Sequence, residues 1–169
     1  MTPAVGVRRF EPRLREDFFR VHSDANGHGW CRCVAWWVNT WEGWSERTAE
    51  QNLAVREQLL ARGEYDGYVL CVDREPVAWC QAGSRDRLRK LVDQLALRPD
   101  PSTWGVMCLF VAPAHRGRGL ASTLLREALV DMRRRGVDGV EASPNGRRRT
   151  WMRCGTDRVR SSRPPAWRW

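Results

Sequence analysis

A glycine-bearing turn between an apolar run and a helical pattern is the stretch of this sequence best suited to chemistry. The residues from Val106 to Ala112 are apolar, Pro113 ends the run, and Gly117 and Gly119 follow in a short loop. Leucines and alanines then recur at helical spacing as far as Gly136. Because glycine has no side chain, the loop and the first helical turn can present several N–H groups in one direction. That arrangement favours binding of a phosphate or diphosphate.

Two common phosphate-binding loops fit this pattern poorly. A nucleoside-triphosphate loop needs Lys and then Ser or Thr after its second glycine, but Leu120 and Ala121 stand there. A dinucleotide-binding fold needs G-x-G-x-x-G directly after a strand. Here Ser122 takes the place of the third glycine, and four residues separate the strand from Gly117. Glu141 lies about where a ribose-binding acid would stand, so the dinucleotide hypothesis stays open.

The residues from Val111 to Ala121 closely resemble the acetyl-CoA-binding motif of the GNAT N-acetyltransferases. That motif has Arg or Gln, two spacer residues, Gly, one spacer residue, and then Gly or Ala. Arg116, Gly119 and Ala121 occupy those places. The resemblance covers about residues 4–143. Within the family, the sequence is similar to an uncharacterised, actinobacterial-type subfamily. It implies a mixed layered α/β sheet of the acyl-CoA N-acyltransferase type and acetyl-CoA as cosubstrate.

The resemblance also implies how acetyl-CoA is held and used. The backbone of the central strand would bind the pantetheine arm through Leu109, Phe110 and Val111. The phosphates would be bound by the loop and the start of the helix, namely by Arg116, Gly117, Arg118, Gly119, Leu120, Ala121 and Ser122. The amine of a small molecule or peptide would attack the thioester directly, with a strand N–H stabilising the oxyanion. A homodimer is compatible with this family.

The sequence identifies no catalytic acid or base. The strand from Thr103 to Ala112 lacks the carboxylate that many family members carry, and the only tyrosines, Tyr65 and Tyr68, precede the motif. Glu141 and His115 are fallback candidates, although His115 fits a solvated loop residue better. A chain of water molecules could deprotonate the amine instead. A catalytically inactive acetyl-CoA-binding module is therefore the alternative to an active enzyme.

The periodicity predicts the order strand, two helices, hairpin, helix, strand, helix, strand. The first strand is expected over Val5 to Phe10 and the first helix over Arg13 to Val21. The remaining expected elements are a helix with Ser45 as N-cap that ends at Gly63, a hairpin of Tyr68–Val72 and Val77–Ala82, a helix capped by Ser84, and a last strand from Val137 to Ala142. This is the GNAT order, with the Ser84 helix as an insertion.

Tryptophans and cysteines gather in the first half of the chain. Most of the tryptophans are expected to pack in the core, with an aromatic acceptor wall as the alternative: Trp30, Trp36, Trp37, Trp41 and Trp44. The spacing of His22, His28, Cys31 and Cys33 lacks a C-x-x-C pair, so no metal site is expected. Three strand cysteines are expected to be buried thiols: Cys71, Cys80 and Cys108.

The net charge of +9 is unevenly distributed along the 169 residues. Residues 131–169 hold 11 Arg against four acidic residues, so they carry +7 and residues 1–130 carry +2. No apolar run approaches the ~20 residues that a membrane helix needs. A soluble, cytoplasmic protein with no membrane partner is the expectation.

The sequence divides into an acetyltransferase domain over 1–146 and an Arg-rich tail over 147–169. The tail has eight Arg and no Leu, Ile or Phe, so it is expected to be disordered or loosely docked. GNAT acetyltransferases usually continue with a last helix and hairpin, and this sequence has no pattern for them. The C-terminus is therefore expected to be truncated or altered, and the activity to be impaired. Nucleic-acid binding through the Arg and Trp residues of the tail is the less favoured alternative.

Overall fold

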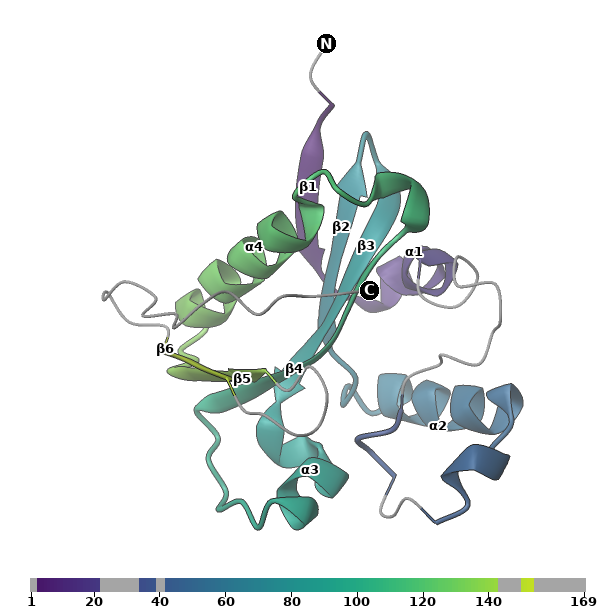
Figure 1. The fold of residues 1–169 in the computed structure, drawn as a ribbon, viewed down its shortest axis with the longest axis vertical. Helices are drawn as coiled ribbons and strands as arrows, with labels where there is room; N and C mark the ends of the chain where they lie inside the picture. Colours follow the sequence, from purple (N-terminus) through teal and green to yellow (C-terminus); the bar gives the residue numbers. More distant parts are fainter. Residues whose placement is uncertain (1–2, 22–33, 39–41, 143–149, 154–169) are drawn as a thin grey trace.

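The computed structural model of the chain is built on one mixed sheet of six strands (Figure 1). It describes residues 3–21, 34–38, 42–142 and 150–153. In spatial order the strands are β1 Val5–Arg9, β2 Gly67–Val72, β3 Glu75–Ser84, β4 Thr103–Val111, β5 Gly139–Ala142 and β6 Thr150–Arg153. The β4–β5 pair is parallel and the other neighbouring pairs are antiparallel. The predicted mixed α/β sheet and its hairpin are therefore confirmed.

Helices cover both faces of the sheet. The described ranges contain α1 Arg15–Phe19, α2 Ala49–Ala61, α3 Arg89–Gln94 and α4 Leu120–Arg134. Figure 1 shows α4 on one side of β1 to β3 and α1 and α2 on the other. In the described part of the chain, no helix combines the length and apolar character that a bilayer crossing requires.

Each face of the sheet has its own hydrophobic core, as the alternation of strand side chains requires. The core under α4 contains Leu109 and Val111 of β4 together with Leu124 and Met132 of the helix. The opposite core contains Phe18, Val69, Trp79 and Phe110 among its buried members. In β4, neighbouring side chains therefore point to opposite layers, which fixes the orientation of the strand that leads into the glycine loop.

Strand β4 parts from β5 halfway along its length. The parallel pairing runs from Thr103 opposite Gly139 to Val106 opposite Ala142, and no described strand pairs with residues 107–111 on that edge. On the other side of β4, Gln81 opposes Cys108 while Ala82 opposes Val106, so Met107 is an extra residue. Such a bulge bends a strand and recurs beside active sites. Among the described residues, the second half of β4 thus has a free edge.

Two predicted helix starts were wrong. The N-cap of α2 is Thr48 rather than Ser45, because Thr48 and Gln51 form a reciprocal capping box. Ser45 lies in a preceding 3-10 turn. Ser84 does not cap a helix either, because it is still paired with Trp104 as the end of β3. A 3-10 turn, η4 Arg85–Arg87, then precedes α3.

Strand β6 lies within the tail that was expected to be disordered or loosely docked. Residues 150–153 pair antiparallel with residues 139–142, so these four residues form an edge strand of the sheet. The outer edge of β5 offers backbone donors and acceptors that an added strand satisfies. Residues 143–149 and 154–169 lie outside the described residues, so the expected lack of a last helix and hairpin stays a prediction.

Candidate functional site

The loop after β4 requires glycine at two positions. Residues 113–115 form a 3-10 turn, and Gly117 and Gly119 then adopt the left-handed conformation with φ of 75° and 73°. Residues with a side chain rarely adopt this conformation. A Cβ atom placed on either glycine would meet no other atom within 4 Å. The backbone conformation, rather than a close packing contact, therefore explains the two glycines.

The N-terminus of α4 is left uncapped by side chains. Its N-cap is Gly119, and the first backbone bond of the helix runs from Thr123 N–H to the Gly119 carbonyl at 3.1 Å. The N–H groups of residues 117–122 donate to no acceptor among the described residues. These open donors lie at the positive end of the helix dipole, so they can bind an anion. They belong to the residues that the sequence predicted for phosphate binding.

Arg116 ties the loop to the preceding strand. Its Nε–H donates to the Val111 carbonyl at 3.0 Å, and its guanidinium lies 5.8 Å from the centre of the Phe110 ring. Arg118, in contrast, is exposed and has no hydrogen bond or ion pair to a described residue. The two loop arginines therefore have different surroundings, which their shared prediction as phosphate ligands did not distinguish.

The free edge of β4 presents the backbone of two of the three predicted strand residues. The Ala112 N–H donates to the Val77 carbonyl at 2.8 Å, which shows that Ala112 bonds toward β3. Backbone direction alternates along a strand, so Phe110 also bonds toward β3 while Leu109 and Val111 point to the free edge. The Val111 carbonyl already accepts the hydrogen bond from Arg116. The Val111 N–H and both backbone groups of Leu109 remain available on that edge.

Glu141 is held in a buried ion pair. Its side chain is 4% exposed, and Oε1 accepts a hydrogen bond from Arg85 Nη1 at 3.1 Å. Arg85 also donates to Asp86 Oδ1 at 3.2 Å and to the Arg98 carbonyl at 2.5 Å. The carboxylate predicted as a fallback base, or as a ribose ligand, is therefore engaged by a structural cation of the η4–α3 segment.

His115 lies in the turn between β4 and the glycine loop. It is half-buried, and its Nδ1 atom is shielded from solvent without a hydrogen-bond partner among the described residues. Its place beside the loop keeps it a candidate for proton transfer. Within the described residues no group of three or more possible metal ligands occurs. The His22, His28, Cys31 and Cys33 set lies outside them.

Sequence reasoning missed Gln81. This β3 residue is 1% exposed, and neither Nε2 nor Oε1 has a hydrogen-bond partner among the described residues. A buried amide without partners is costly, so it requires an explanation. The available signal was a single polar residue inside the otherwise apolar run from Val77 to Ala82.

Three aromatic rings form a stack on the same side of the sheet as α1 and α2. The ring centres of Trp37 and Tyr65 are 5.0 Å apart, and those of Tyr65 and Trp79 are 6.1 Å apart. Trp37 and Trp44 are half-buried and pack against this core, which confirms the expectation for these two tryptophans. Trp30 and Trp41 lie outside the described residues. Cys71 and Cys80 are buried as expected, whereas Cys108 is half-buried.

Solved acetyltransferase structures share this fold. A GNAT acetyltransferase from Brucella melitensis in complex with acetyl-CoA matches with a TM-score of 0.53 and 16% identity, over 84% of this chain and 77% of that one. An aminoglycoside N-acetyltransferase in complex with CoA gives 0.54 and 14%, over 86% and 80%. A GCN5-related N-acetyltransferase from Ralstonia eutropha gives 0.51 and 19%, over 83% and 84%. At these identities the likeness establishes the fold.

The family is established by the sequence itself. No curated protein matches the chain. The family model described as "Acetyltransferase (GNAT) family" matches residues 30–155, which is most of the chain and includes the strand, the glycine loop and α4. The chain belongs to the GNAT family of acetyltransferases.

Proposed function

We propose that the chain is an N-acetyltransferase that moves the acetyl group of acetyl-CoA to an amine. The observation that carries this proposal is the row of open N–H groups at 117–122 beside the free edge of β4. The family assignment supports it, and so do the CoA and acetyl-CoA in the complexes of two proteins with this fold.

The parts of the site suit different parts of acetyl-CoA. The N–H groups of 117–122 and the dipole of α4 would hold the diphosphate, with the exposed Arg118 adding charge. The free backbone groups of Leu109 and Val111 would bond to the amides of the pantetheine arm, much as an added strand does. Arg116 would hold the loop against the end of β4, through its bond to the Val111 carbonyl.

Acetyl-CoA supplies a thioester whose carbonyl carbon an amine can attack. Among the described residues of β4 and β5, the only carboxylate is Glu141, and Arg85 holds it. We therefore favour proton removal from the amine by water over a direct role for Glu141, with His115 as the protein candidate. The lack of a free carboxylate among the described residues of β4 and β5 also favours the second hypothesis, a catalytically inactive acetyl-CoA-binding module.

Calorimetry with acetyl-CoA on two glycine variants tests the binding site. Gly119→Trp places a large side chain over the open N–H groups, and we expect roughly 30-fold weaker binding from losses of about 2 kcal/mol. Gly136→Trp is the matched control, because Gly136 is also left-handed, with φ of 78°, and has equally open surroundings at the other end of α4. Equal affinity in the two variants would remove the proposed cradle.

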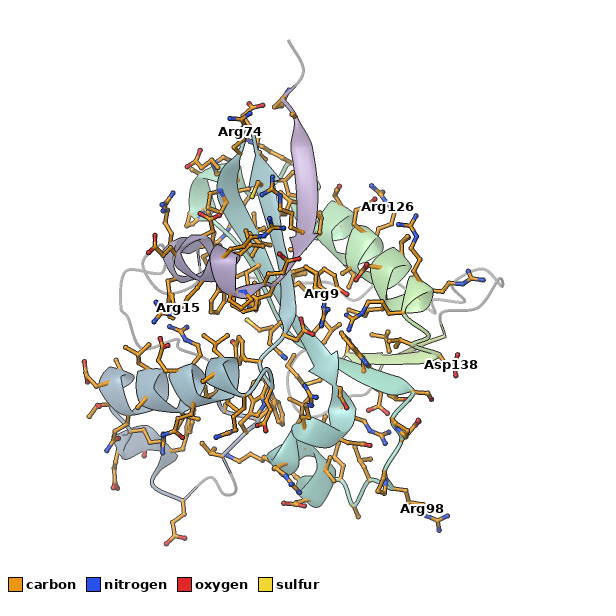
Figure 2. The ribbon with its side chains drawn as sticks, turned by 180° about the vertical axis from the view of Figure 1, so that it is seen from behind. Arg9, Arg15, Arg74, Arg98, Arg126 and Asp138 are labelled. Carbon is orange, nitrogen blue, oxygen red and sulfur yellow. The ribbon has the colours of Figure 1, made fainter. Side chains whose placement is uncertain are left out.

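CoA release in the presence of an amine panel separates the enzyme from the inactive module. Tight acetyl-CoA binding without CoA release above the hydrolysis background would favour the module. The nucleic-acid hypothesis concerns the tail over 147–169, of which the structure describes only residues 150–153. Figure 2 shows that the labelled Arg15, Arg74, Arg98 and Arg126 lie at well-separated places on the rest of the molecule. A homodimer remains a proposal that the size of the protein in solution can test.

A further inference from the structure

Gln81 is the buried polar group that the proposed chemistry leaves without a role. Its side chain is almost completely shielded, at 1% exposure, yet neither atom of its amide has a described partner. An apolar residue of similar size would avoid that cost. A group that is costly in the free protein and lies near a reaction site is suited to contact a substrate.

The register places Gln81 beside the point where β4 and β5 separate. Gln81 opposes Cys108 of β4, and the extra residue Met107 directly precedes Cys108 in that strand. Ala78, Cys80 and Ala82 belong to the core under α4, while Trp79 belongs to the opposite core. Side-chain alternation therefore directs Gln81 to the same face as Trp79, away from α4. It lies one strand away from the edge proposed for the pantetheine arm.

Small residues surround Gln81 on that face of the sheet. Its partner in β2 is Gly67, and the next residue of β3 with the same orientation is Gly83. A Cβ atom at Gly67 would lie 2.5 Å from the ring of Trp79, so glycine makes room for that ring. The half-buried Cys108 is the neighbour in β4. Gln81 therefore lies on the same face of the sheet as the ring of Trp79, which fills the space above Gly67.

The aromatic stack has unpartnered donors of its own. Trp37 and Trp79 belong to the stack formed with Tyr65. The Nε1 atoms of both tryptophans are shielded from solvent and have no hydrogen-bond partner among the described residues. Two N–H donors and one amide, which both donates and accepts, therefore lie on one face. A ligand that satisfies the Gln81 amide must carry a carbonyl-type acceptor and an N–H donor.

We propose that Gln81 selects the acceptor, and that this acceptor is a primary amine with a carboxamide on the neighbouring carbon. Amino-acid amides and peptide N-termini share this chemistry. Gln81 Oε1 would accept from the acceptor's N–H, and Nε2 would donate to its carbonyl. In the transfer, the amine nitrogen bonds to the acetyl carbon, the carbon–sulfur bond breaks, and CoA leaves as a thiol with the amine's proton. This inference rests on the proposed acetyltransferase function.

The test compares Gln81→Met with Gln58→Met, a control at an exposed position of α2. The probes are L-alaninamide, trialanine and sec-butylamine, which lacks the amide. We expect the native chain to prefer L-alaninamide over sec-butylamine by at least about tenfold in kcat/KM. Gln81→Met should lose that preference, whereas Gln58→Met should keep it, since one hydrogen bond is worth about a tenfold change. If trialanine is acetylated at a rate equal to that of L-alaninamide, the acceptor is a peptide N-terminus. If trialanine is not acetylated, the acceptor is a small amide.

Acetyl-CoA affinity, measured for each variant, keeps this test separate from the proposed function. Loss of acetyl-CoA binding in the native chain would sink the proposed function. Normal binding with an unchanged amide preference in Gln81→Met, or with no acetylation of any probe, would overturn the role of Gln81. A purely structural Gln81 predicts a changed melting temperature and unchanged selectivity. If Gln81→Met fails to fold, NMR of the native chain provides the test. The side-chain amide signal of Gln81 should shift when L-alaninamide is added with CoA, and a signal that does not shift would overturn the proposal.

Discussion

At the scale of single residues, the environment of Cys80 makes the stability of the fold depend on alkaline pH. Complete burial raises the pKa of this thiol from 9.0 to about 12. In the folded chain the thiol stays neutral, while in the unfolded chain it ionises above pH 9, so its contribution is present below pH 9 and is lost as the pH rises toward 12. We expect the free energy of unfolding to fall by about 1.4 kcal/mol more in the native chain than in Cys80→Ala between pH 8 and 10. Urea denaturation at both pH values measures this difference, and parallel decreases in the two proteins would contradict it.

Individual residues also mark the limit of what the sequence could predict about the site. The turn at Gly117 and Gly119 could be predicted, because a left-handed backbone conformation depends mainly on residue type. The φ values of both glycines are in that left-handed range. The separate surroundings of Arg116 and Arg118 could not be predicted, because they depend on where the Val111 carbonyl points. Gln81 was missed for a similar reason. Its importance depends on cross-strand neighbours and on partners that it lacks, and neither can be read from spacing along the chain.

At the scale of elements, the pair of Arg85 and Glu141 joins the η4–α3 segment to β5. Both side chains are buried, at 5% and 4% exposure. Removing one partner leaves a buried charge uncompensated, so we expect Arg85→Met to destabilise the fold by about 3–5 kcal/mol. Arg85→Met combined with Glu141→Leu should recover most of this loss, because it buries no charge. Arg89→Met, on the exposed side of α3, is the control and should stay within about 0.5 kcal/mol of the native chain.

Denaturant midpoints of the four proteins measure this coupling, and a double variant no more stable than Arg85→Met would contradict it. The ion pair could not be predicted from spacing, because 56 residues separate its partners along the chain. Elements with strong local patterns were predicted more successfully. The hairpin, β4 and α4 follow apolar periodicity. Helix α2 begins at Ala49, because Thr48 rather than Ser45 forms the local capping box. Strand β6 was missed because its formation depends on an edge supplied by β5.

At the scale of the whole molecule, acetyl-CoA binding should change amide hydrogen exchange in a pattern that alternates along β4. The open N–H groups of 117–122 and the edge-facing N–H groups of Leu109 and Val111 should exchange more slowly once acetyl-CoA is bound, because each gains an acceptor. The N–H of Phe110 already bonds toward β3, so its exchange should change less. A ligand at 100 times its Kd also stabilises the folded chain by about 2.7 kcal/mol, which slows exchange through global unfolding everywhere. The site-specific signal is therefore the protection that exceeds this common increase. Gly119→Trp should lose it in the loop, and Gly136→Trp should keep it. Extra protection at Phe110 with none at Leu109 would mean that Phe110, and not Leu109, directs its N–H to the free edge of β4. That result would contradict binding of the pantetheine arm by Leu109 and Val111.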